Sequence, residues 1–299
     1  MDILKDLRIK VHIDGIALSC SAQEEDVTLP DRIGKYRMVK PPFKLSASRS
    51  SDKRCVHYRY RLVYQHKVTG NYLWACRGRH SGGNSIPAVY LTFFSSYQHP
   101  LTFDDVDRAL GVLNEDFAIT FQISKIDVAI DLIHPNEIGL HRRVLRAINP
   151  KRKRDVRVIG QTTKTLIIGA PSSAHRVTAY DKGQQLSQVK KINVAGDISR
   201  IEVRLRSSVL KKSVQTIKDL RNVGWAAPIY GRFFSLDRAT PKLMDLLGKG
   251  IARKPIRKLK HILIRKFGAV PNNFSRDCLR EHNRFGPAIR KALETFKWS

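Results

Sequence analysis

Several separate segments of this chain alternate between aliphatic and polar residues. Residues 125–131 and 199–206 are the clearest, because Ile, Val or Leu recurs at every second position. Side chains of a β-strand point alternately to its two faces, so a period of two predicts strands with one aliphatic and one charged face. Such strands favour a sheet whose aliphatic face is covered by other elements.

Other segments extend this pattern into a fold. Strand-like stretches rich in Val, Ile, Leu and Tyr occupy residues 7–13, 57–65, 72–78, 88–94, 123–133, 156–159, 165–168 and 176–180. Residues 102–113 and 140–148 instead place apolar side chains at helical spacing. Thr69-Gly70-Asn71 is typical of a hairpin turn. We therefore predict an α+β fold, a mainly antiparallel sheet covered by helices on one face, with a small basic helical C-terminal region.

The balance of charges points to a polyanionic partner. The chain has 55 Lys and Arg residues against 26 Asp and Glu, a formal net charge of +29. Anionic membranes usually attract one concentrated basic helix, whereas cationic residues recur here from Lys5 to Lys297. Nucleic acid is therefore the expected partner, bound with a steep dependence on salt.

The sequence also argues against several classes of protein. There is no run of about 18 apolar residues and no basic segment followed by an apolar one near residue 1, so we expect a cytoplasmic protein without membrane contact. The four cysteines, Cys20, Cys55, Cys76 and Cys278, form no Cys-x-x-Cys pair. We interpret them as reduced thiols rather than as zinc ligands or disulfides.

Two alternating segments carry acids on their charged faces. Asp127 and Asp131 share one face of a predicted strand, where they would repel each other unless a cation, either a metal ion or nearby Arg and Lys, compensates them. Glu202 lies among Arg200, Arg204 and Arg206. Taken alone, that second segment favours a solvated outer face with ion pairs.

A third segment, residues 175–182, offers a nucleophile. Arg176, Thr178, Tyr180 and Lys182 share a face, and a tyrosine hydroxyl beside a cation can attack phosphorus. Most strand tyrosines only pack, with a polar tip. Together, however, the three segments supply a nucleophile, oxygen ligands for a divalent cation and guanidinium groups, which are the parts that DNA transesterification requires.

In type and order these motifs resemble the Rep-trans family of replication initiators, found on small rolling-circle plasmids and filamentous phages. The motifs are Lys-Ile-Asp-Val-Ala-Ile-Asp at 125–131, Thr-Leu-Ile-Ile-Gly at 165–169, Tyr-Asp-Lys at 180–182 and Arg-Ile-Glu-Val-Arg-Leu-Arg at 200–206. The resemblance covers roughly residues 120–210. It implies that Tyr180 is the nicking tyrosine, that Lys182 is the lysine that follows it, and that Asp127, Asp131 and Glu202 are candidate metal ligands.

The metal that these ligands imply is Mg²⁺ or Mn²⁺, because carboxylate and water ligands suit those ions. A histidine-based site is not expected, since the chain has no His-hydrophobic-His pair. We expect DNA contacts from basic side chains near the site, namely Arg176, Arg200, Arg204, Arg206 and the run Lys151, Arg152, Lys153 and Arg154.

The resemblance implies a bacterial cytoplasmic enzyme that nicks one strand at an origin, at a single-stranded or hairpin site. Further partners would be a host helicase and a host polymerase. A second copy of the chain, forming a homodimer, is another partner that the resemblance allows. The domains would be an irregular and strand segment at 1–50, an α+β nicking domain at 51–235 and a basic helical region at 236–299. Two alternatives stay open: a metal-dependent hydrolytic nuclease without a covalent intermediate, and a nucleic-acid-binding protein without catalysis.

Overall fold

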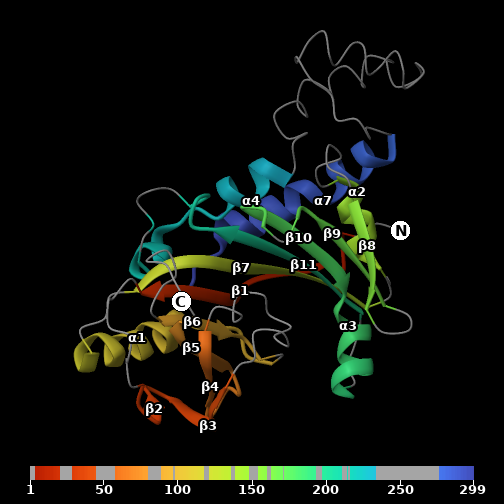
Figure 1. Cartoon of the computed structure of the whole chain (residues 1–299). Coiled ribbons are helices and arrows are strands. Elements are labelled where there is room, and N and C mark those ends of the chain that lie inside the picture. The colour runs from red at the N-terminus through yellow and green to blue at the C-terminus, as the bar shows by residue number, and fades with distance from the viewer. Residues whose placement is uncertain are drawn as a thin grey trace. The chain divides into compact units, whose positions relative to one another are not determined.

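The computed structural model is an α+β protein built on a large antiparallel sheet with a few helices (Figure 1). The residues that it describes are 4–20, 29–44, 58–79, 89–96, 98–117, 121–135, 139–147, 154–159, 163–170, 172–192, 197–210, 214, 216–233 and 276–299. The predicted fold class is confirmed. The predicted basic helix of the C-terminal region, around residues 253–266, lies outside the described residues.

The chain divides into two compact units, each assembled from separate segments. Unit 1 comprises Met1–Val11, Ala129–Val203 and Gly224–Phe296. Unit 2 comprises His12–Val128, Arg204–Val223 and Lys297–Ser299. The predicted domains, 1–50, 51–235 and 236–299, were contiguous pieces of chain, and these boundaries stay a prediction.

In the described part of the chain, eleven strands follow one hydrogen-bonding order, β2-β3-β4-β5-β6-β1-β7-β11-β10-β9-β8. Those of unit 2 are β2 (Arg32–Ile33), β3 (Tyr36–Lys44), β4 (Tyr58–His66), β5 (Tyr72–Arg79) and β6 (Val89–Phe94). Those of unit 1 are β8 (Arg154–Ile159), β9 (Thr163–Ile168) and β10 (His175–Asp181). Strands β1 (Arg8–Cys20), β7 (Phe121–His134) and β11 (Asp197–Arg206) contribute residues to both units.

In unit 2, helix α1 (Phe103–Phe117) covers one face of the sheet (Figure 1). The Thr102 hydroxyl accepts a hydrogen bond from the Asp105 amide, which confirms the predicted start of this helix. The register places Tyr64, Leu73 and Phe93 in one row across β4, β5 and β6, and each is fully buried. This row is part of the core of unit 2.

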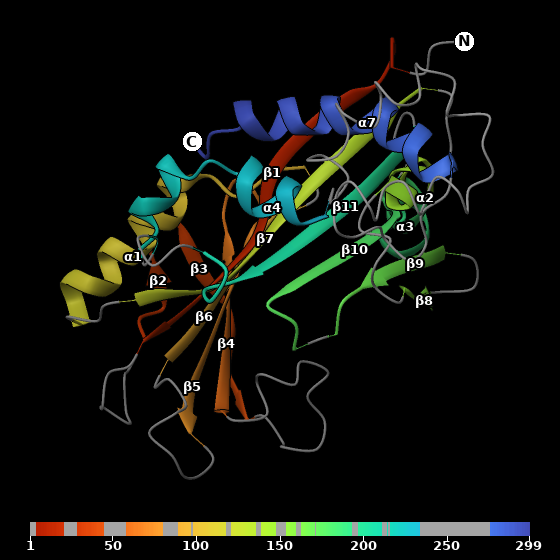
Figure 2. The same cartoon turned by 90° about the horizontal axis from the view of Figure 1, so that it is seen from above.

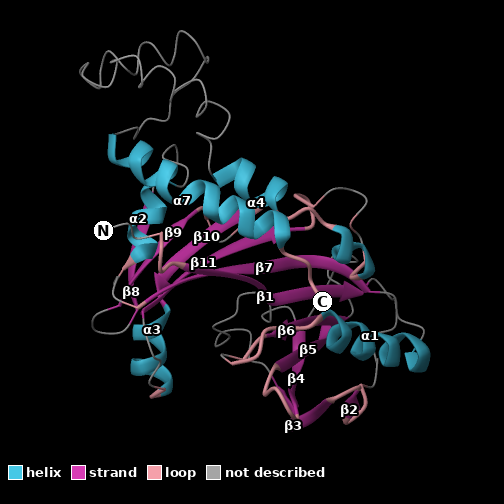
Figure 3. Cartoon of the chain, turned by 180° about the vertical axis from the view of Figure 1, so that it is seen from behind, coloured by secondary structure: helices cyan, strands magenta, loops and turns pink. Residues whose placement is uncertain are grey.

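In unit 1, helices cover one face of the strands. Helices α4 (Ala226–Phe233) and α7 (Arg276–Thr295) lie over the same face (Figures 2 and 3), and α2 (Leu140–Ala147) packs against α7. Phe285 and Ile289 of α7 are fully buried, as are Val177 and Ile201 of the strands. The other face of β10 and β11 is therefore the one that carries the polar side chains of the alternating segments.

Two parts of the fold were not expected. The first is β3, which extends through Pro41 and Pro42 although the sequence around them does not alternate like a strand. Its pairing with β4 shifts between Lys40 and Phe43. Prolines are tolerated in such a bulge because residues there do not need to donate a hydrogen bond to the neighbouring strand. The second is α3 (Lys182–Gln185), which continues into a π-helical turn at Leu186–Lys190 directly after β10.

A candidate phenol–carboxylate site

The candidate site begins with the last strand residues of β10. The Tyr180 hydroxyl donates a hydrogen bond of 2.5 Å to Oε1 of Glu202, which lies on the neighbouring strand β11. Both residues belong to unit 1. The period-two pattern of residues 200–206 places Glu202 on the charged face, and its contact with Tyr180 shows that the two predicted residues meet on that face.

The Tyr180 side chain is nevertheless largely enclosed, since only 7% of it is exposed. Glu202 beside it is half-buried. The hydroxyl is thus held by a carboxylate at a partly covered position rather than presented openly to solvent.

Lys182 stands next to the same phenol because β10 ends at this point. Asp181 caps α3 by accepting a hydrogen bond of 2.8 Å from the Gln184 amide, so the chain turns into the helix directly after Tyr180. The Lys182 Nζ lies 5.6 Å from the centre of the Tyr180 ring and donates to Gln185 Oε1 at 3.0 Å. The site therefore holds a phenol, a carboxylate and an ammonium group within one unit.

Asp131, also in unit 1, is held by a guanidinium group. Arg200 Nε donates to Asp131 Oδ1 at 2.6 Å and Arg200 Nη2 donates to Oδ2 at 2.8 Å. Both side chains are buried. This is a two-point ion pair of the kind that fixes an arginine in one orientation.

Asp127 lies in unit 2 and is compensated by two cations. Lys125 Nζ lies 2.6 Å from its Oδ2, and Arg204 Nε donates to Oδ1 at 2.7 Å. Burial alone would raise the pKa of the Asp127 carboxyl, but the charges of Lys125 and Arg204 outweigh burial and hold that pKa below its usual value. Of the two ways of compensating the aspartates that the sequence left open, nearby Arg and Lys are the one seen here.

The carboxylates do not fit a divalent ion in this arrangement. Each aspartate already directs both oxygens to a guanidinium group, and Glu202 accepts from Tyr180. Among the described residues, no group of three His, Cys, Asp or Glu side chains is arranged to hold a metal ion. Coordination by Asp127 or Asp131 would require that Arg204 or Arg200 first be released.

The residues predicted to contact DNA have different settings. Arg200 and Arg204 hold the two aspartates, Arg206 is exposed and Arg176 is half-buried. Lys151, Arg152 and Lys153 lie outside the described residues. Arg154 begins β8, but its side chain also lies outside what the structure describes.

Sequence reasoning missed a buried histidine near the site. His141 of α2 is 1% exposed, and its Nδ1 lies 3.1 Å from the Ser199 hydroxyl. Burial lowers the pKa of His141 to about 4, although the charge of Asp181 opposes the change. The sequence did carry a sign of this burial. Ser199 falls on the aliphatic face of its alternating segment, and His141 lies next to Leu140 at the start of α2, so both positions predict side chains in the core.

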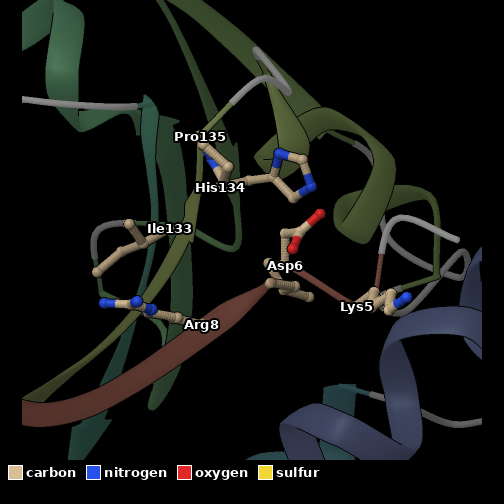
Figure 4. A pocket seen from close by; sticks show the side chains of 7 residues that line it. Lys5, Asp6, Arg8, Ile133, His134 and Pro135 are labelled. Carbon is tan, nitrogen blue, oxygen red and sulfur yellow. The ribbon is translucent and has the colours of Figure 1, made fainter. Parts of the chain in front are cut away.

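Unit 1 also contains a pocket of about 490 Å³ that is separate from the predicted site residues (Figure 4). Its lining combines Lys5, Arg8 and His134 with apolar side chains such as Ile133. None of the predicted nucleophile or metal-ligand residues lines it.

Comparisons with known proteins add little to this geometry. No protein-family model matches the chain, and no curated protein matches it in sequence. Among solved structures, a rolling circle replication initiator protein from Geobacillus stearothermophilus is similar over 98% of this chain and 99% of its own, with 12% identity and a TM-score of 0.43. A similarity of that size does not establish a function for this chain. Among the described helices, none is both long and apolar enough to cross a membrane.

Proposed function

We propose that this chain is a rolling-circle replication initiator that nicks one DNA strand through a covalent link to Tyr180. The observation that supports the proposal is the 2.5 Å hydrogen bond from the Tyr180 hydroxyl to Glu202, with the Lys182 ammonium beside the same ring. A nucleophile paired with an adjacent base is the arrangement that covalent catalysis needs. The net charge of +29 supplies the attraction for DNA.

In the proposed reaction, Tyr180 transfers its hydroxyl proton to Glu202 as the phenolic oxygen attacks the scissile phosphorus. The bond from phosphorus to the 3′ oxygen breaks, and that oxygen takes a proton from water. The products are a 5′-phosphotyrosyl link and a free 3′ hydroxyl, which primes a host polymerase. Lys182 would stabilise the negative charge that develops on the phosphoryl oxygens.

The substrate in this proposal is an origin whose nick site is single-stranded or forms a hairpin. Half-buried Arg176 of unit 1 would bind a phosphate of that segment, and exposed Arg206 of unit 2 is a separate proposed DNA contact. A host helicase, which would separate the strands ahead of the polymerase, and a second copy of the chain are further proposed partners. The same chemistry run in reverse rejoins the displaced strand, because the phosphotyrosyl bond conserves the energy of the bond that it replaced.

Binding of a divalent cation is a separate hypothesis, and the reaction proposed for Tyr180 and Glu202 does not depend on it. Mg²⁺ or Mn²⁺ would supply positive charge for the phosphoryl oxygens if Glu202 bound it, or if Arg204 or Arg200 first released Asp127 or Asp131. Binding of Mn²⁺ to the wild type, measured by calorimetry and compared with a Glu202→Gln variant, tests it directly. If the two proteins take up Mn²⁺ equally or not at all, Glu202 is not a ligand.

One observation favours a second candidate, a nucleic-acid-binding protein without catalysis. Tyr180 is only 7% exposed, and a tyrosine that merely packs with a hydrogen-bonded tip has this same appearance. The third reading, a hydrolytic nuclease, needs metal-bound water and finds no support in aspartates that are held by arginines.

The three candidates are separated by a Tyr180→Phe variant incubated with single-stranded oligonucleotides and Mn²⁺. The oligonucleotides carry a label at the 3′ end, because the fragment that becomes linked to tyrosine retains that end. We expect the wild type to give a labelled protein band in a denaturing gel and Tyr180→Phe to give none, even though its DNA affinity is unchanged. Tyr64→Phe is the matched control, since Tyr64 is also buried and donates one hydrogen bond, to the Pro30 carbonyl.

The other outcomes contradict the proposal. Cutting that persists in Tyr180→Phe without a covalent band indicates a hydrolytic nuclease. Neither cutting nor a covalent band in the wild type, together with tight DNA binding, indicates the non-catalytic protein.

A further inference from the structure

In unit 2, the sheet face opposite α1 carries aromatic side chains that are not enclosed in a core. The register places Tyr72 of β5 directly across from Gln65 of β4 and Phe94 of β6. The next row on the same face joins Trp74 to Val63 and Thr92, and the row after that joins Arg61, Cys76 and Tyr90. Residues directly opposite each other in antiparallel strands share a face, so these three rows form one surface.

The two faces of these strands differ in how far their aromatic side chains are buried, although Val63, Cys76 and Thr92 between the exposed rings are buried as well. On the α1 side, Tyr64, Leu73 and Phe93 are fully buried. On the other side, Tyr72 is 38% exposed, and Trp74 and Phe94 are half-buried. Large aromatic side chains left in contact with solvent on a sheet face indicate a surface that binds something.

On this surface, rings and a guanidinium group pack against one another in the way that flat ligands stack on protein side chains. The Arg61 guanidinium lies 4.5 Å from the centre of the Trp74 ring, and the Trp74 and Phe94 ring centres are 4.8 Å apart at 61°. The Gln65 amide donates to the Tyr72 hydroxyl at 3.2 Å. We call the five residues Arg61, Tyr72, Trp74, Tyr90 and Phe94 the aromatic face.

Charge on the same surface favours an anionic ligand. Strand β3 adds exposed Arg37 opposite Gln65 and exposed Lys40 opposite Val63. Strand β1 adds the small residues Gly15, Ala17 and Ser19 opposite Phe94, Thr92 and Tyr90. On the next strand, β7, the Asp127 carboxylate lies beside Gly15, but Lys125 and Arg204 compensate its charge. The surface therefore combines aromatic rings with net positive charge.

We propose that the aromatic face of unit 2 binds single-stranded DNA by stacking unpaired bases on Trp74, Phe94 and Tyr72 while Arg37, Lys40 and Arg61 bind the phosphates. Stacking on aromatic rings next to cations is how proteins hold single strands without reading their sequence. A duplex cannot use such a surface in this way, because its bases are already stacked. The inference rests on the proposed function, to which it adds a binding site outside the phenol–carboxylate pair.

The test measures affinity for a labelled oligo(dT) by fluorescence anisotropy in the full chain. We expect Trp74→Ala to weaken binding about tenfold and Tyr72→Ala several-fold, the range that loss of one stacked base produces. Tyr60→Ala is the matched control. Tyr60 is also 38% exposed, but it neighbours Arg61 on β4 and therefore lies on the opposite face, so its loss should leave affinity within about twofold.

Tryptophan fluorescence gives a second readout that does not depend on a disruptive change. Trp225 and Trp298 are buried, so quenching by bound oligo(dT) should arise from Trp74. Trp74→Phe keeps a stacking ring and should bind normally with little quenching. The proposal is wrong if quenching survives in Trp74→Phe, or if Trp74→Ala and Tyr72→Ala bind as tightly as Tyr60→Ala, which would leave the face to a protein partner.

This failure is distinguishable from failure of the proposed function. Tyr180→Phe should bind and quench like the wild type but form no covalent product. Trp74→Ala should recover covalent product when the oligonucleotide is raised to saturation. If Trp74→Ala binds normally while Tyr180→Phe loses the product, only the aromatic face is refuted. If Tyr180→Phe still forms the product, only the nicking tyrosine is refuted.

Discussion

At the scale of single residues, the two-point ion pair between Asp131 and Arg200 should contribute strongly to stability. Both side chains are buried, so Arg200→Ala leaves a carboxylate inside the protein without its main cation. Removal of one partner from a buried pair typically costs about 3–5 kcal/mol of unfolding free energy. Urea denaturation of the variant and the wild type measures the loss.

The pair between Arg221 and Asp104 is the control for that measurement. Its side chains are 53% and 69% exposed, so Arg221→Ala should cost less than about 1 kcal/mol. Equal losses in the two variants would mean that water reaches Asp131 as freely as Asp104.

His141 predicts a pH dependence of stability. Because burial lowers its pKa from 6.5 to about 4, the unfolded chain binds a proton in this range that the folded chain does not. The contribution is fully present above pH 6.5 and is lost as the pH falls towards 4, by about 2 kcal/mol at pH 4.5. Unfolding free energies at pH 7 and pH 4.5 should therefore differ more in the wild type than in His141→Gln. An identical difference in both proteins would refute the assignment.

At the scale of elements, the start of α1 depends on residues near the opposite end of the sequence. The Phe103 amide donates to the Ser299 carbonyl, and Trp298 Nε1 donates to the Leu101 carbonyl at 2.7 Å. The Trp298 and Phe103 rings also meet edge to face. We expect Trp298→Ala to cost about 3–5 kcal/mol, and Trp298→Phe less, about 1–2 kcal/mol, because it keeps a ring but removes the hydrogen bond and part of the buried surface.

Hydrogen exchange in α1 tests this prediction locally. The amides of α1 should exchange faster in Trp298→Ala than in Trp298→Phe, whereas those of α7 should change little. Uniform protection of α1 in all three proteins would show that the helix stands without Trp298.

Elements with a strong period were predictable, and the exceptions have physical causes. Alternation alone identified the strands of Tyr180 and Glu202 and their charged faces. It missed β3, where bulges break the period, and it missed α3, whose four residues are too few for a helical pattern. It could not say whether metal or arginine compensates Asp127 and Asp131, because that depends on which side chains of the neighbouring strand face them.

At the scale of the whole molecule, composition predicted the class of partner but not where it binds. The charge of +29 follows from counting residues, and it indicates a polyanion whatever the fold is. The aromatic face could not be predicted from the sequence. Tyr72, Trp74 and Phe94 lie on two strands, and only the register shows that they share a face while Leu73 and Phe93 point into the core.

The interleaved tracing of the chain restricts how this protein can be altered. Because β1, β7 and β11 each contribute residues to both units, no single cut of the polypeptide releases either unit whole. The phenol and its carboxylate therefore cannot be transplanted as a cassette, nor can one half be exchanged by a simple gene fusion. Such a protein is therefore expected to evolve through point substitutions and loop insertions, with unit 1 and unit 2 inherited together.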